Sequence, residues 1–285
     1  MIKTIRILLL GTILLASGLT HAETKKTITI GVNNWAENIA VANLWKILLD
    51  EKGYEVKLQN ADKALLYNGV AQGRIDATFE VWLPSADKPS FDKIKDKVAL
   101  VGPWLPEANL GLAVPDYVTI DSVDQLNANK EDFESRGEPT IVGIDSGSGL
   151  MALTTKAKEQ YQLDYKVLPS SESGMLLALE RALKRKEPVV VTLWKPHWVW
   201  AKHKLRYLKD PKGVFGETDS IYGIISKSFK AEHPEVERWM QQWKMDDSSL
   251  GGLMAEIIEQ GRTDPEKGTR VWLEANRALT EHWLR

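Results

Sequence analysis

Three tryptophans stand where an apolar, strand-like run gives way to a turn or helix: Trp35, Trp82 and Trp194. The face of a tryptophan ring attracts a cation by roughly 0.5–2 kcal/mol, and by more when water is excluded. A trimethylammonium group suits several such faces, because it donates no hydrogen bonds and its methyl surface is weakly hydrated. Any one of these tryptophans, taken alone, is more often a core residue. Their shared position at strand ends is what predicts a cage for a quaternary ammonium ion.

A glycine-rich turn supplies a second chemical feature. Residues 143–150 read Gly-Ile-Asp-Ser-Gly-Ser-Gly-Leu, which ends a strand pattern and opens a helix pattern. The first N–H groups of a helix are unpaired and carry a positive partial charge, so an anion fits there. The Gly-Ser-Gly signal is weak alone, and no Gly-Lys-Ser/Thr follows to suggest a phosphate loop. A cation cage combined with a carboxylate pocket describes glycine betaine.

Alternating strand and helix patterns must position these residues. Parallel α/β units show this alternation, with the helices on the faces of the sheet. The first unit has strands at 27–32, 54–58 and 75–81, with helices at 37–51 and 64–72. The second has strands at 140–144, 165–168 and 188–193, with helices at 150–161 and 171–186. Helices at 234–243, 250–260 and from 265 to the end follow.

Two α/β units predict two lobes with a cleft between them. We expect lobe I to comprise residues 27–110 plus 217–285, and lobe II residues 111–216. Ligands bind beyond the carboxyl ends of the strands in open α/β sheets. Trp35 and Trp82 then belong to lobe I, while Trp194 and the glycine-rich turn belong to lobe II. A ligand that touches both lobes would hold them closed about a hinge.

The composition of the chain limits the classes of binding partner and the cellular compartment that can be expected. Lys and Arg total 37 against 39 for Asp and Glu, so no basic footprint points to nucleic acid. The chain has no cysteine for disulfides, thiolate metal sites or a thiol nucleophile. Residues 1–22 are typical of a cleaved secretory signal, in which Lys3 and Arg6 precede the apolar stretch 7–15. No cysteine follows to carry a lipid anchor, so we expect a periplasmic protein.

Catalytic motifs are not evident in the sequence. An enzyme needs a nucleophile with a base, a metal cluster or a cofactor loop, and none of these patterns stands out. We therefore predict no enzyme, no cofactor and no metal. Glu37 and Glu80 leave a glycosidase as the enzymatic alternative, since tryptophans also stack on sugars. A sensory protein that passes its ligand to a membrane receptor is a further alternative.

The chain resembles the glycine betaine/choline-type substrate-binding proteins of ABC importers over nearly all of residues 27–285. This resemblance implies a two-lobed periplasmic binding protein fold, a monomer, and an inner-membrane ABC permease with its ATPase as partner. It also implies that Trp35, Trp82 and Trp194 form the cage and that the amides of Gly149 and Leu150 hold a carboxylate. The matching segments are Asn34-Trp35-Ala36-Glu37, Val81-Trp82-Leu83-Pro84, residues 143–151, Ser170-Ser171-Glu172 and Trp194-Lys195-Pro196-His197-Trp198.

One position departs from the betaine-binding pattern. Where such proteins carry a carboxylate-binding histidine, five residues after the second cage tryptophan, this chain has Asp87. Glu37 instead matches an acid that choline binders of the family place two residues after the first cage tryptophan, and Ser148 is a second hydroxyl partner. His197 is more often a structural residue near the hinge than a ligand contact. Glycine betaine is the first choice of ligand, with choline, carnitine and proline betaine as alternatives.

Overall fold

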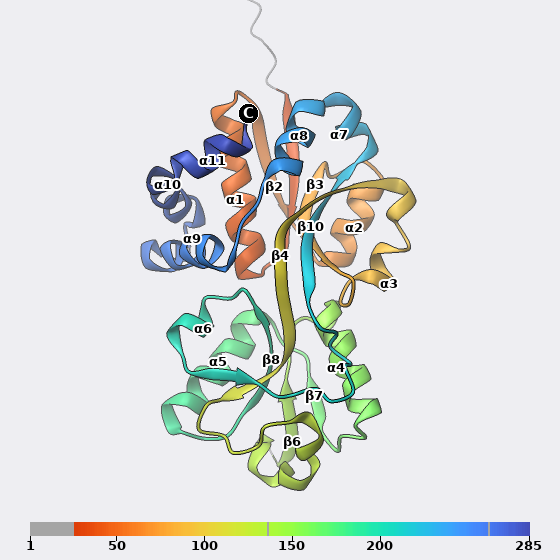
Figure 1. Cartoon of the computed structure of the whole chain (residues 1–285), viewed down its shortest axis with the longest axis vertical. Helices are drawn as coiled ribbons and strands as arrows, with labels where there is room; N and C mark the ends of the chain where they lie inside the picture. The colour runs from red at the N-terminus through yellow and green to blue at the C-terminus, as the bar shows by residue number, and fades with distance from the viewer. Residues whose placement is uncertain (1–25, 136, 262) are drawn as a thin grey trace, which may run out of the picture.

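The structure is a computed structural model, and it describes residues 26–135, 137–261 and 263–285. It shows two lobes, one above the other, joined by the long strand β4 (Val98–Pro115) (Figure 1). The predicted signal, residues 1–22, lies outside the described residues. None of the helices in the described ranges is long and apolar enough to cross a membrane.

The upper lobe holds a mixed sheet with the strand order β2-β1-β3-β10-β4. β1 pairs in parallel with β2 and β3, as the alternating pattern predicts, whereas β10 runs antiparallel to both β3 and β4. Neither β4 nor β10 was predicted as a strand. The strands are β1 (Thr27–Val32), β2 (Glu55–Asn60), β3 (Ala77–Leu83) and β10 (Asp219–Ser226).

Helices from both ends of the chain cover this sheet. They are α1 (Ala36–Glu51), α2 (Lys63–Ala71), α3 (Lys88–Phe91), α7 (Lys227–Glu232), α8 (Pro234–Gln242), α9 (Asp247–Gln260), α10 (Pro265–Ala275) and α11 (Arg277–Trp283). The predicted last helix is thus two helices, which meet at Asn276. α1 packs against β1 and β3 and against α9 and α10, so eleven of its sixteen residues are buried.

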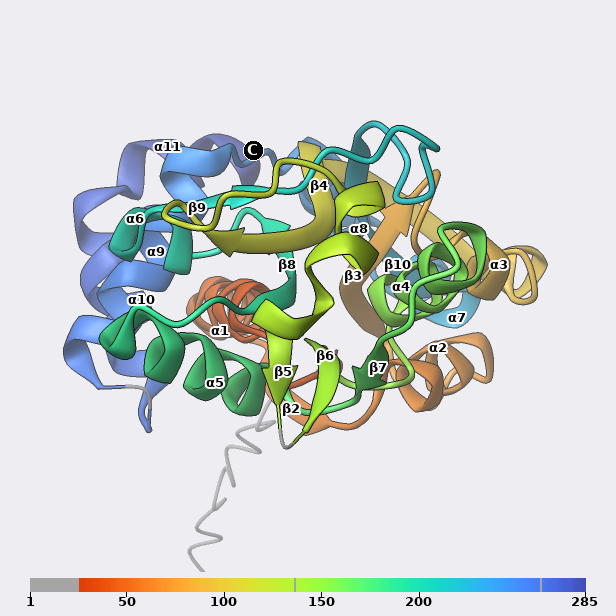
Figure 2. The same ribbon diagram turned by 90° about the horizontal axis from the view of Figure 1, so that it is seen from below.

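The lower lobe continues the sheet beyond β4. β8 runs antiparallel to β4, and β6 pairs in parallel with β8 and β7. Figure 2 shows α4 and α5 on opposite sides of β6. The elements are β5 (Glu134–Ser135), β6 (Glu138–Val142), α4 (Gly149–Gln160), β7 (Lys166–Leu168), α5 (Glu172–Arg185), β8 (Val190–Lys195), α6 (Val199–Lys202) and β9 (Leu205–Tyr207), with 3-10 turns at Lys95–Lys97, Val123–Gln125 and Asn127–Phe133.

β4 belongs to both halves of the sheet. It pairs with β10 from Val98 to Ala108 and with β8 from Asn109 to Ala113. The chain returns to the upper lobe between β9 and β10. Two extended segments therefore connect the lobes, which is the arrangement that allows hinge closure.

Most of the other tryptophans stabilise the core. Trp45, Trp239, Trp243, Trp272 and Trp283, which lie in or directly after helices of the upper lobe, are buried. Trp104, which the sequence analysis did not single out, stacks on Trp243 with ring centroids 4.6 Å apart and planes 4° apart. Offset ring stacking of this kind adds to the burial energy of the upper lobe.

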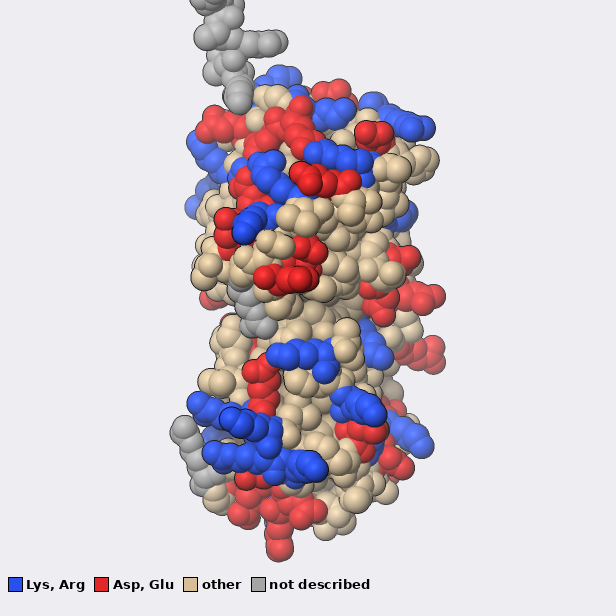
Figure 3. Space-filling model, turned by 90° about the vertical axis from the view of Figure 1, so that its left-hand side faces the viewer, with Lys and Arg blue, Asp and Glu red and all other residues tan. Residues whose placement is uncertain are grey.

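The surface carries charges of both signs. On the face drawn in Figure 3, Lys, Arg, Asp and Glu side chains occur on both lobes, and the molecule narrows between them. No single-sign field covers this face, in agreement with the nearly balanced composition.

Candidate functional site

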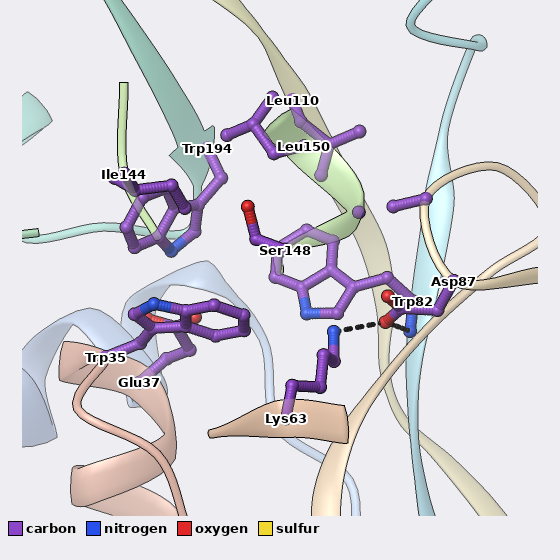
Figure 4. Close-up of a pocket in the computed structure, with 12 residues that line it drawn as sticks. Trp35, Glu37, Lys63, Trp82, Asp87, Leu110, Ile144, Ser148, Leu150 and Trp194 are labelled. Atoms are coloured by element: carbon purple, nitrogen blue, oxygen red, sulfur yellow. Dashed lines mark hydrogen bonds and ion pairs between the residues drawn. The ribbon is translucent and has the colours of Figure 1, made fainter. Parts of the chain in front are cut away.

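A cavity of about 290 Å³ lies between the lobes. Side chains from both lobes point into it (Figure 4). It is lined by Trp35, Glu37, Lys63, Trp82, Ala86, Asp87, Leu110, Ile144, Ser148, Gly149, Leu150 and Trp194. Eight of the nine site residues chosen from the sequence are therefore brought together, and the ninth, His197, is not among the lining residues.

The three tryptophans come from three different strand ends. Trp35 follows β1 and occupies the N-cap position of α1. Trp82 and Trp194 each lie one residue before the last residue of their strands, β3 and β8, so both strands run further than predicted. The Trp35 and Trp194 rings are 6.4 Å apart and inclined by 54°. All three side chains are at least nine-tenths buried between the lobes.

Carboxylates accept hydrogen bonds from the indole N–H groups of two of these tryptophans. The indole N–H of Trp35 donates to Oδ2 of Asp145 at 3.0 Å, a contact that joins the two lobes. The indole N–H of Trp82 donates to Oε2 of Glu80 at 2.8 Å. A hydrogen bond at the edge of a ring fixes its orientation and does not occupy its electron-rich faces, where a cation binds.

Glu37 places a buried carboxyl group in the cavity wall. It lies in the first turn of α1 and is 1% exposed, and its Oε2 atom has no hydrogen-bond partner among the described residues. Burial raises the pKa of Glu37 well above its ordinary value, and the carboxylates of Glu80 and Glu172 raise it further. Burial of this kind favours the neutral acid, and a cation beside the group favours the carboxylate.

The cavity also contains an ion pair that the sequence analysis missed. The ammonium of Lys63, the first residue of α2, pairs with Oδ2 of Asp87, which also accepts the backbone N–H of Trp82 at 2.8 Å. Lys63 Nζ lies 5.0 Å from the ring centre of Trp35. Asp87 is therefore neutralised, and does not stand as an unpaired anion. The available signal was that Lys63 follows β2 at the same sheet edge as the tryptophans.

The start of α4 offers hydrogen-bond donors. Ser148 caps the helix, and its Oγ accepts the N–H of Met151 at 3.2 Å. The first N–H groups of a helix have no partner within the helix, which applies to the amides of Gly149 and Leu150, and both residues line the cavity. A Cβ at Gly149 would lie 2.3 Å from the carbonyl oxygen of Ala86 in the other lobe. Only glycine allows this approach.

His197 lies behind Trp194. The two rings make an edge contact with centroids 4.9 Å apart. The His197 Nδ1 accepts the N–H of Val199 at 3.1 Å, so Nε2 carries the proton and donates to Oε1 of Glu172 at 3.2 Å. The other oxygen of Glu172 accepts the N–H of Ala36 across the lobes at 2.9 Å. His197 thus supports the closed arrangement from outside the cavity.

In the described part of the chain, no group of three or more His, Asp and Glu side chains could hold a metal ion. The cavity instead combines aromatic faces, one buried carboxyl group, one ion pair and two backbone amides. These groups can bind a small ion that carries positive charge on methylated nitrogen.

Comparison with known proteins gives a consistent result. The family described as the substrate-binding domain of ABC-type glycine betaine transport systems matches residues 26–275. The glycine betaine/carnitine transport binding protein GbuC of Listeria monocytogenes is 32% identical over 157 residues, which are 54% of this chain and 52% of that protein. The chain therefore matches about half the length of this relative.

Two solved structures match nearly the whole chain. Lactococcal OpuAC in its closed, glycine betaine-bound form is 32% identical, with a TM-score of 0.83 over 92% of this chain and 100% of that one. A choline-binding protein of an ABC transporter, solved with choline, is 25% identical, with a TM-score of 0.83 over 90% of this chain and 91% of that one.

Proposed function

Because the chain belongs to the family of substrate-binding domains of ABC-type glycine betaine transport systems, we propose that it captures a quaternary ammonium osmolyte, with glycine betaine first, and delivers it to an ABC permease. Its family and structural relatives are binding proteins rather than enzymes. The glycosidase alternative is therefore set aside.

The observation that carries this proposal is the composition of the interlobe cavity. Trp35, Trp82 and Trp194 offer three aromatic walls from two lobes, and the start of α4 offers amides from the lower lobe. Methylated nitrogen fits the walls, and a carboxylate fits the amides. A ligand that fills both parts binds the lobes to each other.

The proposal extends to domain organisation and location. We propose that residues 27–110 and 217–285 form one lobe and residues 111–216 the other. The change of partner of β4, from β10 to β8 after Ala108, supports this division. We further propose that the protein acts as a monomer in the periplasm after removal of residues 1–22. A sensory role would use the same closed lobes.

A calorimetric panel tests the ligand class. We expect glycine betaine to bind, to quench tryptophan fluorescence, and to bind more tightly than maltose, a neutral control. Choline, carnitine and proline betaine complete the panel. Absence of binding by all four quaternary ammonium compounds would contradict the proposal.

A tryptophan variant then tests the cage itself. Trp194→Ala should lower affinity by about tenfold or more, because one desolvated cation–π contact is worth roughly 2 kcal/mol. Trp239→Phe is the control. Trp239 is buried and is not among the residues that line the cavity, so this variant should leave affinity unchanged. Unaltered affinity in a folded Trp194→Ala protein would make Trp194 a purely structural residue.

Choline is the second candidate, and Glu37 is the observation that favours it. A carboxylate in the wall accepts the choline hydroxyl and balances its net positive charge. The likeness to a choline-binding protein supports this alternative as well.

A further inference from the structure

We infer that Lys63 determines the specificity of the cavity: its ammonium, held by Asp87, faces the anionic end of a zwitterionic ligand and makes the cavity prefer a betaine to the free cation choline. This inference rests on the proposed function and narrows its ligand class. Lys63 is not among the site residues predicted from the sequence.

Lys63 is built into the cavity rather than placed at its rim. The residue is 9% exposed, and its ammonium is directed to Asp87, which is itself 1% exposed. Among the described residues Asp87 is its one hydrogen-bond acceptor. An ammonium has three N–H donors, so donors remain for a ligand oxygen.

The lining carries groups of both charges. Figure 4 shows Lys63 and Asp87 beside Trp82, and Glu37 beside Trp35; the Lys63 ammonium also lies 5.0 Å from the ring centre of Trp35. Because Lys63 and Asp87 cancel, the pair adds no net charge but leaves a positive group exposed to the cavity. Glu37 provides the only other ionisable group of the lining residues.

The start of α4 lies next to the segment that carries Asp87. Gly149 approaches the carbonyl of Ala86 so closely that a Cβ would meet it at 2.3 Å, and Ala86 directly precedes Asp87. Gly149 and Leu150 from one lobe and Lys63 from the other therefore line the same cavity. Charged donors strengthen hydrogen bonds to a carboxylate roughly twofold over neutral ones.

This arrangement discriminates between ligands that share a trimethylammonium head. A betaine places a carboxylate between the amides and Lys63, so both of its charges are matched. Choline places a neutral hydroxyl there, so the cavity then holds the positive charges of the ligand and of Lys63 without an anion on the ligand to match them. Like charges in a cavity shielded from water repel, because the local dielectric constant is low.

Two variants test the inference by calorimetry with glycine betaine, choline and tetramethylammonium. Lys63→Met alone leaves Asp87 buried without its counter-ion. The double variant Lys63→Met/Asp87→Asn removes both charges and keeps the side-chain volumes. Lys88→Met is the matched control, since its exposed ammonium lies next to Asp87 in sequence but pairs with Asp92.

We expect the double variant to lose about tenfold or more in affinity for glycine betaine, the cost of one charge-assisted hydrogen bond. Choline and tetramethylammonium should keep or gain affinity, and Lys88→Met should bind all three as before. An equal change for all three ligands overturns the role of Lys63. Tighter binding of choline than of glycine betaine by the unmodified protein overturns it independently of any variant. Failure of the unmodified protein to bind any of them overturns the proposed function instead.

Discussion

Buried carboxyl groups set the electrostatics around the three tryptophans. Glu37 and Glu80 are both 1% exposed, and each has one carboxylate oxygen without a partner among the described residues. Burial is the main cause that raises the pKa of both groups. Burial favours the neutral acid and a nearby cation favours the carboxylate, as the charge of Lys63 does for Glu80.

The variant Glu37→Gln should affect the affinity for ligands with a net positive charge more than the affinity for zwitterionic ligands. We expect choline to lose about tenfold in affinity, because the variant cannot supply the negative charge that balances a net cation. Glycine betaine should lose less, since it carries its own anion. Isothermal titration calorimetry at one pH measures both. Equal losses for the two ligands would refute the assignment of Glu37 to the cation.

Glu80 makes the stability of the ligand-free protein depend on pH. Its pKa is raised from 4.5 to about 7, so the folded state binds more protons than the unfolded state between these values. Stability should therefore fall as pH rises from about 4.5 to about 7. Glu80→Gln, which keeps an oxygen for the indole N–H of Trp82, should flatten this slope. Urea unfolding at several pH values measures it, and parallel curves for the two proteins would contradict the expectation.

The sequence could identify most of the cavity lining but not its ion pair. Tryptophans at strand ends are visible because strand ends meet at one edge of a sheet. Lys63 and Asp87 are 24 residues apart. No local sequence pattern predicts that these two side chains form an ion pair, or that Asp87 also accepts the N–H of Trp82. From the sequence, Asp87 is only a departure from the histidine of the betaine-binding pattern, and its counter-ion Lys63 appears only in the structure. The ligand-binding roles of the lining residues stay predictions.

Among the elements, the start of α4 controls whether the lobes can meet. Gly149→Ala puts a Cβ 2.3 Å from the Ala86 carbonyl oxygen, whereas Gly147→Ala, two residues earlier, meets nothing within 4 Å. We expect Gly149→Ala to lower affinity by about a hundredfold, since overpacking against backbone costs roughly 1–3 kcal/mol and closure needs this contact. Gly147→Ala should bind normally. Calorimetry and thermal unfolding of both variants measure this; normal affinity in Gly149→Ala would show that closure does not require the contact.

Regular patterns made most of the longer elements predictable, and broken patterns hid the two long strands β4 and β10 as well as the short strands β5 and β9. β1 to β3, α1, α2, α4 and α5 follow clear periodicities. β4 contains Gly102, Pro103 and Pro106, which resemble a linker, and its pairing is supplied by strands far along the chain. β10 pairs with β3 and β4, which lie more than 100 residues earlier in the chain, and not with the preceding strand β9. Long-range pairing therefore outweighed local propensity in both strands.

At the scale of the whole molecule, direct contacts already join the lobes outside the cavity. Trp35 donates to Asp145 and Ala36 donates to Glu172, each across the cleft. A bound ligand adds its own contacts to both lobes and favours the closed, folded state over the unfolded one.

Ligand binding should therefore raise thermal stability. Glycine betaine at a hundred times its dissociation constant should add about 2.7 kcal/mol to the free energy of unfolding. For a protein of this size that corresponds to roughly 5–10 °C in the unfolding midpoint. Differential scanning fluorimetry measures the shift against equimolar sodium chloride. A midpoint that stays constant across the whole ligand panel would rule out tight binding to the folded state.

The place of β10 in the sheet has a consequence for how the protein is made. β10 lies between β3 and β4, although Ser85 and Asp219, which hydrogen-bond at this junction, are 134 residues apart. A growing chain that ends before Asp219 has no strand for this slot, so the upper lobe cannot complete its sheet during most of translation. Pairings so distant in sequence also form slowly. Under the proposed export route, we expect this late assembly to favour an unfolded chain during translocation.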